Sequence, residues 1–138
     1  MTKGMEWQVC SLESSKRLKE LGVKQESLFL WFVHERVNEP DYKDCLCVSS
    51  ENNKWNYPEV DWNHYAAFTV AELGEMLPDW FYSQRLDGDR GWVCDGDREM
   101  NPNPYIECWT NNTEAEVRAK MLIHLIENNL IKGAGKNE

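Results

Sequence analysis

The sequence predicts an α+β fold in which a small antiparallel sheet is packed by about three helices. Three stretches near the start, middle and end of the chain combine a helix-capping residue with apolar residues at helical spacing. Short apolar or aromatic stretches, separated by turn residues, lie between them and predict strands. Because 138 residues suffice for one buried core, we expect a single domain over residues 1–132 and a polar tail over 133–138.

The first helix is expected over residues 12–21, because Ser11 can cap its first turn and Gly22 suits the position after its end. The next stretch, 27–33, is apolar at six consecutive positions after its first residue. Such a pattern predicts a central strand covered on both faces, or a strand whose outer face meets a partner.

A shorter strand is expected over residues 45–49. The segment 51–63 is rich in Asn, Pro and aromatic residues, and we expect it to be a loop. Thr69 and Glu72 then have the spacing of a capping box, in which each side chain bonds the other residue's backbone N–H. A short helix should follow, and Pro78 should end it.

A strand is expected to begin at residues 80–82 and to turn at residues 87–88, where Asp-Gly is a strong hairpin signal. Its return strand should cover 92–94. A second Asp-Gly step at 95–96 predicts another turn. The two strands should therefore form a hairpin that is bounded by acidic turns.

The last strand is expected over residues 105–109, where alternation places Glu107 and Trp109 on one face. A terminal helix follows, and Thr113 with Glu116 predicts a second capping box at its start. Its apolar stripe should pack on the core. The stripe consists of Val117, Met121, Leu122, Leu125 and Ile126.

Segments 12–23, 68–78 and 115–131 together resemble small uncharacterised proteins of gut Bacteroidetes and of their phages or prophages. The three segments lie in the same order in those proteins and cover about a third of this chain. They are helices with their caps and apolar stripes. The resemblance therefore implies a fold and a genomic setting, and it carries over no catalytic residue.

Twenty-four acidic and fifteen basic residues give a net charge of −9, which repels phosphate backbones and anionic membranes. We therefore expect no direct nucleic-acid binding and no membrane binding. The first residues lack the apolar core of a secretory signal. Five cysteines without a framework spacing predict free thiols in a reducing cytoplasm, and the resemblance implies that this is the cytoplasm of a bacterial host. They are Cys10, Cys45, Cys47, Cys94 and Cys108.

The most acidic stretch, 87–99, contains two Asp-Gly-Asp steps eight residues apart. Carboxylates from both steps could bind a hard cation such as Ca²⁺ or Mg²⁺ if they meet on a hairpin. The EF-hand spacing is missing, however, and Asp-Gly steps form turns by backbone chemistry alone. A third interpretation is an acidic surface for a basic partner. No cofactor is predicted.

Aromatic residues are abundant, and Trp55, Tyr57, Trp62 and Tyr65 cluster in the polar segment before the second helix. They could cap the core or anchor a partner, because Trp and Tyr are enriched at protein interfaces. The residues expected to bind a partner are Asp87, Asp89, Trp92, Asp95, Asp97, Glu99, Trp55 and Trp62.

The chain contains no Gly-x-Ser-x-Gly, His-Glu-x-x-His or glycine-rich phosphate loop, so we do not expect an enzyme. The sequence instead predicts a protein that occupies a basic surface of a host protein. One version is an anti-defence inhibitor, anti-CRISPR-like or imitating the charge of nucleic acid. The alternatives are a metal-dependent enzyme that uses the Asp-Gly-Asp pair, and a structural domain that forms a homodimer through residues 28–33 or the helix stripe.

Overall fold

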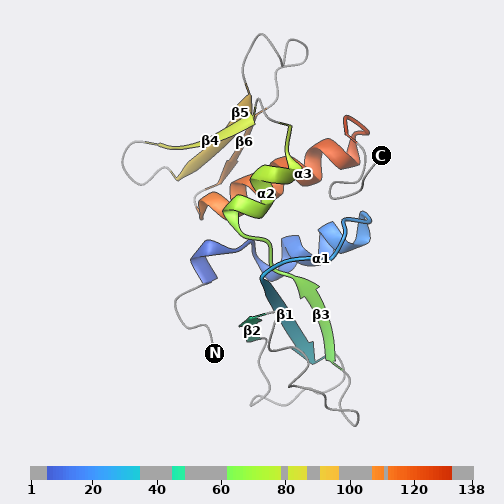
Figure 1. Cartoon of the computed structure of the whole chain (residues 1–138). Helices are drawn as coiled ribbons and strands as arrows, with labels where there is room; N and C mark the ends of the chain where they lie inside the picture. Colours follow the sequence, from blue (N-terminus) through green and yellow to red (C-terminus); the bar gives the residue numbers. More distant parts are fainter. Residues whose placement is uncertain are drawn as a thin grey trace.

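A computed structural model describes residues 6–34, 45–48, 62–78, 81–86, 91–96, 107–110 and 112–131. Within these ranges the chain forms a short 3-10 helix, three α-helices and two three-stranded antiparallel sheets. The predicted α+β class and its three helices are confirmed, and the strands are divided between two sheets rather than gathered in one. Figure 1 shows the helices lying between the two sheets.

The 3-10 helix η1 (Glu6–Gln8) precedes α1 (Leu12–Glu20), which begins where the Ser11 cap predicts. The Ser11 hydroxyl accepts a hydrogen bond from Ser14 N at 3.1 Å. Gly22 follows the helix with a φ of 90°, a left-handed conformation that glycine adopts without steric cost. Both ends of α1 are therefore specified by single residues next to them.

The first sheet places β1 (Phe29–His34) between β2 (Cys45–Val48) and β3 (Trp62–Ala66), both antiparallel to it. The predicted central strand is confirmed. Phe32 on one face of β1 and Val33 on the other are both buried. Apolar residues at consecutive positions therefore reflect burial on two sides, as expected for a strand in the middle of a sheet.

The loop predicted over 51–63 is wrong at its end, because β3 begins at Trp62. Five consecutive pairs join this strand to β1, from Leu30↔Ala66 to His34↔Trp62. Pairing with a central apolar strand outweighs the local polar composition that predicted a loop. The remainder of the predicted loop lies outside the described residues.

The second helix, α2 (Val70–Met76), begins with both hydrogen bonds of the predicted capping box. Thr69 Oγ1 accepts from Glu72 N at 3.2 Å, and Glu72 Oε1 accepts from Thr69 N at 2.9 Å. The same carboxylate accepts hydrogen bonds from Ser27 Oγ at 2.7 Å and Leu28 N at 2.9 Å. Glu72 therefore closes the first turn of α2 and also fixes the chain where it enters β1.

The second sheet has the order β4 (Phe81–Arg85), β5 (Trp92–Gly96) and β6 (Glu107–Thr110), with neighbours antiparallel. The predicted hairpin between β4 and β5 is confirmed by its pairing. Its expected turn at Asp87 and Gly88 lies outside the described residues.

The second predicted turn, at Asp95 and Gly96, is wrong. Both residues belong to β5, where Asp95 pairs with Tyr82 and Gly96 pairs with Phe81. An Asp-Gly step favours a turn only locally, and here pairing with the neighbouring strand determines the backbone.

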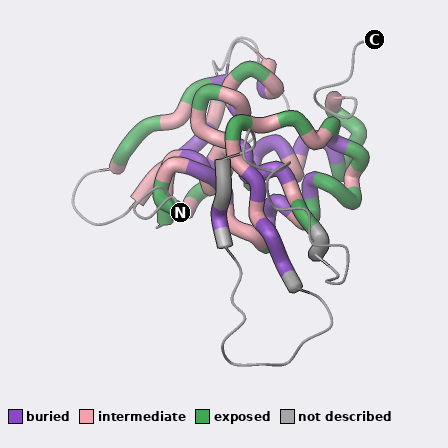
Figure 2. Tube along the Cα trace, turned by 60° about the horizontal axis from the view of Figure 1, so that its bottom comes forward, coloured by how far each residue is buried: buried purple, intermediate pink, exposed green. Residues whose placement is uncertain are grey.

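The terminal helix, α3 (Glu114–Glu127), contacts α1, α2 and all three strands of the second sheet. Its predicted apolar stripe is confirmed, because all five residues are buried. They are Val117, Met121, Leu122, Leu125 and Ile126. Figure 2 shows the buried segments in purple, and seven buried residues of α3 belong to the main core cluster.

The start of α3 forms only half of its predicted capping box. Thr113 Oγ1 accepts a hydrogen bond from Glu116 N at 3.1 Å. The Glu116 carboxylate, instead of returning to Thr113, accepts from Ser11 N at 2.8 Å, Ser11 Oγ at 3.2 Å and Ser14 Oγ at 2.7 Å. The prediction of a closed box is therefore wrong, because a carboxylate gains more donors at the positive end of α1.

Candidate binding face

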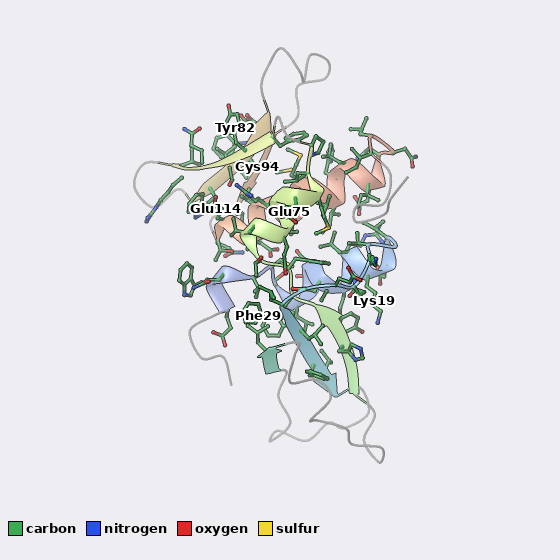
Figure 3. All side chains as sticks on the ribbon, viewed as in Figure 1. Lys19, Phe29, Glu75, Tyr82, Cys94 and Glu114 are labelled. Carbon is green, nitrogen blue, oxygen red and sulfur yellow. The ribbon has the colours of Figure 1, made fainter. Side chains whose placement is uncertain are left out.

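The second sheet has one face packed on α3 and one face turned away from it. Side chains alternate along each strand, and Phe81, Cys94 and Cys108 belong to the core that α3 covers. In Figure 3, Tyr82 points away from the helices, whereas Cys94 lies on the side of the sheet toward α2 and α3. We call the opposite side of the sheet the outer face. Its described residues are Tyr82, Gln84, Val93, Asp95, Glu107 and Trp109.

The register arranges the outer face as two rows of three residues. Tyr82, Asp95 and Glu107 form one row across β4, β5 and β6, and the other row contains Gln84, Val93 and Trp109. Neighbouring strands lie about 4.8 Å apart, and two residues along a strand span about 6.8 Å. Tyr82 and Trp109 therefore lie at opposite corners, about 12 Å apart by the same spacings.

Each corner places an exposed aromatic ring beside a carboxylate. Tyr82 is 47% exposed and stands directly opposite Asp95. Trp109 is 49% exposed, and its Nε1 donates a hydrogen bond to Glu107 Oε2 at 3.0 Å. Val93, between the two corners, is buried. The six positions carry two carboxylates and no basic side chain, so a cation can meet a ring face and a negative charge at either corner.

Polar contacts on the inner side hold this sheet against the helices. Ser83 on β4 donates a hydrogen bond to Glu114 Oε2, and Arg118 Nε donates to Ser83 Oγ at 2.8 Å. Arg118 Nη1 also donates to the Val70 carbonyl at 3.0 Å. On the other edge, Lys120 Nζ donates to the Trp109 carbonyl at 3.0 Å. Both edges of the second sheet are thereby fixed to α3.

Of the residues predicted to bind a partner, Asp95 lies on the outer face in the middle of its row. Trp92 lies on the opposite side and packs, partly buried, against the core. Trp62 begins β3 in the other sheet, and the structure does not describe its side chain. The remaining predicted residues lie outside the described ranges. They are Asp87, Asp89, Asp97, Glu99 and Trp55.

The sequence prediction did not select Tyr82 and Trp109 for binding. Alternation along 105–109 correctly placed Trp109 and Glu107 on one face. This alternation was the sequence signal that could have pointed to Trp109. Locating Tyr82 beside Asp95 requires the register of the β4–β5 hairpin. The predicted return strand ended at residue 94, so the sequence prediction left Asp95 out of this pairing.

The described ranges contain no group of three or more His, Cys, Asp or Glu side chains that could hold a metal ion. Among the carboxylates of the predicted cation site, Asp95 alone belongs to those ranges, so the cation hypothesis stays a prediction. In the same part of the chain, no helix has the length and apolar character that a membrane crossing requires.

Comparison with known proteins found no match to this chain. No protein-family model matches the chain, and neither a curated protein nor a solved structure matches it. The outer face is therefore interpreted from its own chemistry.

Proposed function

We propose that this chain is a small acidic accessory protein, of the kind carried by phages and mobile elements. It binds a basic surface of a host protein in the bacterial cytoplasm. The observation that carries this proposal is the outer face of the second sheet, where Tyr82 and Trp109 are exposed beside Asp95 and Glu107. The phage setting is supported by the resemblance of three sequence segments.

The chemistry of the face favours lysine or arginine as the contacted side chain. A cation over an aromatic ring gains about 0.5–1 kcal/mol at an exposed site and about 2 kcal/mol when water is excluded. The carboxylate beside each ring adds Coulomb attraction, and the net charge of −9 increases the rate of encounter with a basic surface. Two corners about 12 Å apart allow two basic side chains of one partner to bind together.

An anti-defence inhibitor is the specific version that we propose. A nuclease that binds DNA or RNA presents a basic groove to phosphates, and an acidic protein can occupy that groove by imitating their charge. The excess of nine negative charges and the carboxylates of the outer face support this version. It requires that nucleic acid and this protein compete for one site.

Capture from a bacterial lysate tests the proposal. The immobilised chain should retain a basic protein at low salt and release it as salt is raised, because screening weakens contacts between charges. A variant with Asp95→Asn and Glu107→Gln removes two charges at nearly constant shape and should release the same protein at lower salt. DNA or RNA added to the column should displace a captured nuclease.

Three results would count against the proposal. The first is that no basic protein is retained at low salt. The second is that the Asp95→Asn, Glu107→Gln variant retains the protein as strongly as the unmodified chain over the whole salt range. The third concerns the inhibitor version alone, and it is a captured protein that nucleic acid does not displace.

A further inference from the structure

Two cysteines face each other across the second sheet. Cys94 on β5 and Cys108 on β6 are directly opposite in the antiparallel register. Both lie on the side that packs against α3, where Cys94 is fully buried and Cys108 is partly exposed. Both are free thiols. The functional hypotheses for this chain use neither residue.

The spacing of this pair is that of a disulfide. Directly opposite residues in an antiparallel ladder have Cα atoms about 4.5–5.5 Å apart, and their Cβ atoms lie on the same side of the sheet. Disulfides join residues whose Cα atoms are about 4.4–6.8 Å apart. A bond between Cys94 and Cys108 therefore needs rotation of the side chains and little movement of the backbone.

Burial keeps the two thiols protonated at neutral pH. Desolvation, assisted by the neighbouring Cys108, raises the pKa of Cys94 to about 12. Desolvation also raises the pKa of Cys108, although Lys120 opposes this shift. Because the thiolate is the nucleophile in disulfide exchange, reaction at neutral pH is slow and begins at the partly exposed Cys108.

We propose that Cys94 and Cys108 form a redox modification site, in which a small disulfide oxidant converts the two thiols into a cross-strand disulfide between β5 and β6. The Cys108 thiolate attacks one sulfur of the oxidant, forms a mixed disulfide and expels the first thiolate. Cys94 then loses its proton, attacks the Cys108 sulfur and expels the second thiolate. The two protein thiols lose two electrons and two protons, which convert one oxidant disulfide into two thiols.

The new bond lies behind the outer face and joins two of the three strands that form it. It closes a loop of 15 residues when both cysteines are counted, a loop length at which cross-linking stabilises a chain appreciably. The melting temperature of the oxidised chain should therefore rise by about 5 °C or more. The inference does not depend on the proposed function, since it follows from the register alone.

Peptide mapping of the oxidised chain tests the proposal. The folded full-length protein is incubated with oxidised glutathione, its remaining thiols are alkylated, and it is digested with trypsin. Arg90, Arg98 and Arg118 place the two cysteines in separate peptides, 91–98 and 99–118. We expect these peptides to be joined, with a mass about 2 Da below their sum, and to separate after reduction with dithiothreitol.

Two comparisons give the test a control. The yield after a fixed short time should be about tenfold higher at pH 8 than at pH 7, because the thiolate fraction rises tenfold per pH unit below the pKa. Cys108→Ser should abolish the linked peptide, whereas Cys10→Ser should retain it, since Cys10 bonds Ser15 Oγ at 3.3 Å in another part of the core.

Peptide mapping of the unmodified chain tests the proposal even if a variant does not fold. Glutathione that remains attached to Cys108 without a link to Cys94 would overturn the proposal. So would a linked peptide that joins other cysteines, or no change after prolonged incubation at pH 9.

Discussion

The Glu116 carboxylate joins α3 to the first turn of α1. It accepts three hydrogen bonds from Ser11 and Ser14, and its partners lie about a hundred residues away in sequence. A negative charge at this position also meets the positive end of the α1 dipole. One side chain therefore connects the start of the chain to its last helix.

Replacing Glu116 tests this connection. Glu116→Ala should lower the free energy of unfolding by about 2–3 kcal/mol, because it leaves partly buried donors without a charged acceptor. Glu116→Gln should cost less, because the amide oxygen still accepts a hydrogen bond. Urea unfolding measures both effects.

A surface glutamate of the same helix provides the matched control. Glu127 bonds Arg17 at 2.9 Å with both side chains exposed, so Glu127→Gln should change stability little. Equal losses for the Glu116 and Glu127 variants would contradict the structural role of Glu116.

The buried Cys10 thiol makes stability depend on alkaline pH. Desolvation raises its pKa to about 11, whereas an unfolded chain has a cysteine pKa of about 8.5. Above pH 8.5 the unfolded chain therefore releases this proton first, and stability falls as the pH rises toward 11. The slope for one such thiol is about 1.4 kcal/mol per pH unit.

Unfolding in urea at several pH values between 8 and 10.5 measures this slope. Cys10→Ala should be less stable at every pH, because it leaves a cavity, but its stability should fall less steeply. Parallel curves for the variant and the unmodified chain would show that Cys10 does not titrate as inferred.

At the scale of the elements, α2 and α3 approach closely at a glycine. Gly74 leaves space for the Arg118 guanidinium, which donates to Ser83 Oγ and to the Val70 carbonyl. A Cβ atom at position 74 would overlap Arg118 Nη1. Glycine is a poor helix former, so its presence in α2 is explained by this contact.

A double-mutant cycle measures the contact. Gly74→Ala should destabilise the chain by about 1–2 kcal/mol, although alanine gains about 1 kcal/mol in helix propensity, because Arg118 must give up its hydrogen bonds. In an Arg118→Ala background the same change should be neutral or stabilising. A stabilising effect in the unmodified chain would mean that Arg118 moves aside without loss.

The sequence correctly predicts the helices, because the residues that cap each helix lie next to it in the chain. Ser11, Thr69 and Thr113 each start a helix as expected, because a cap acts within one turn. The division into two sheets could not be predicted, since local patterns do not say which strands pair with one another. The partners of Glu116 were missed because they lie about a hundred residues away. The turn at Asp95 was wrong because pairing with β4 outweighs the local turn preference.

The candidate site, too, could be predicted from the sequence only in part. Composition predicted an acidic, aromatic surface, and alternation placed Glu107 beside Trp109. Register alone brings Tyr82 next to Asp95 and directs Trp92 into the core side of the sheet. Which aromatic residues are exposed therefore follows from tertiary structure and is not contained in the local sequence.

At the scale of the whole molecule, charge and the arrangement of the described elements support the proposed binding face. The helices lie between the two sheets, so the outer face of the second sheet is turned away from them (Figure 1). It combines two exposed rings with two carboxylates in a chain whose net charge is −9. This combination is why we propose a basic protein surface as the partner.

The most direct test compares two exposed tryptophans in binding the captured host protein. Trp109 lies on the outer face, and Trp7 is 61% exposed on η1, outside that sheet. Trp109→Ala should raise the Kd about tenfold or more, as expected for an interface anchor, and Trp7→Ala should leave it unchanged. An unchanged Kd for Trp109→Ala, or an equal loss for Trp7→Ala, would contradict the assignment of this face.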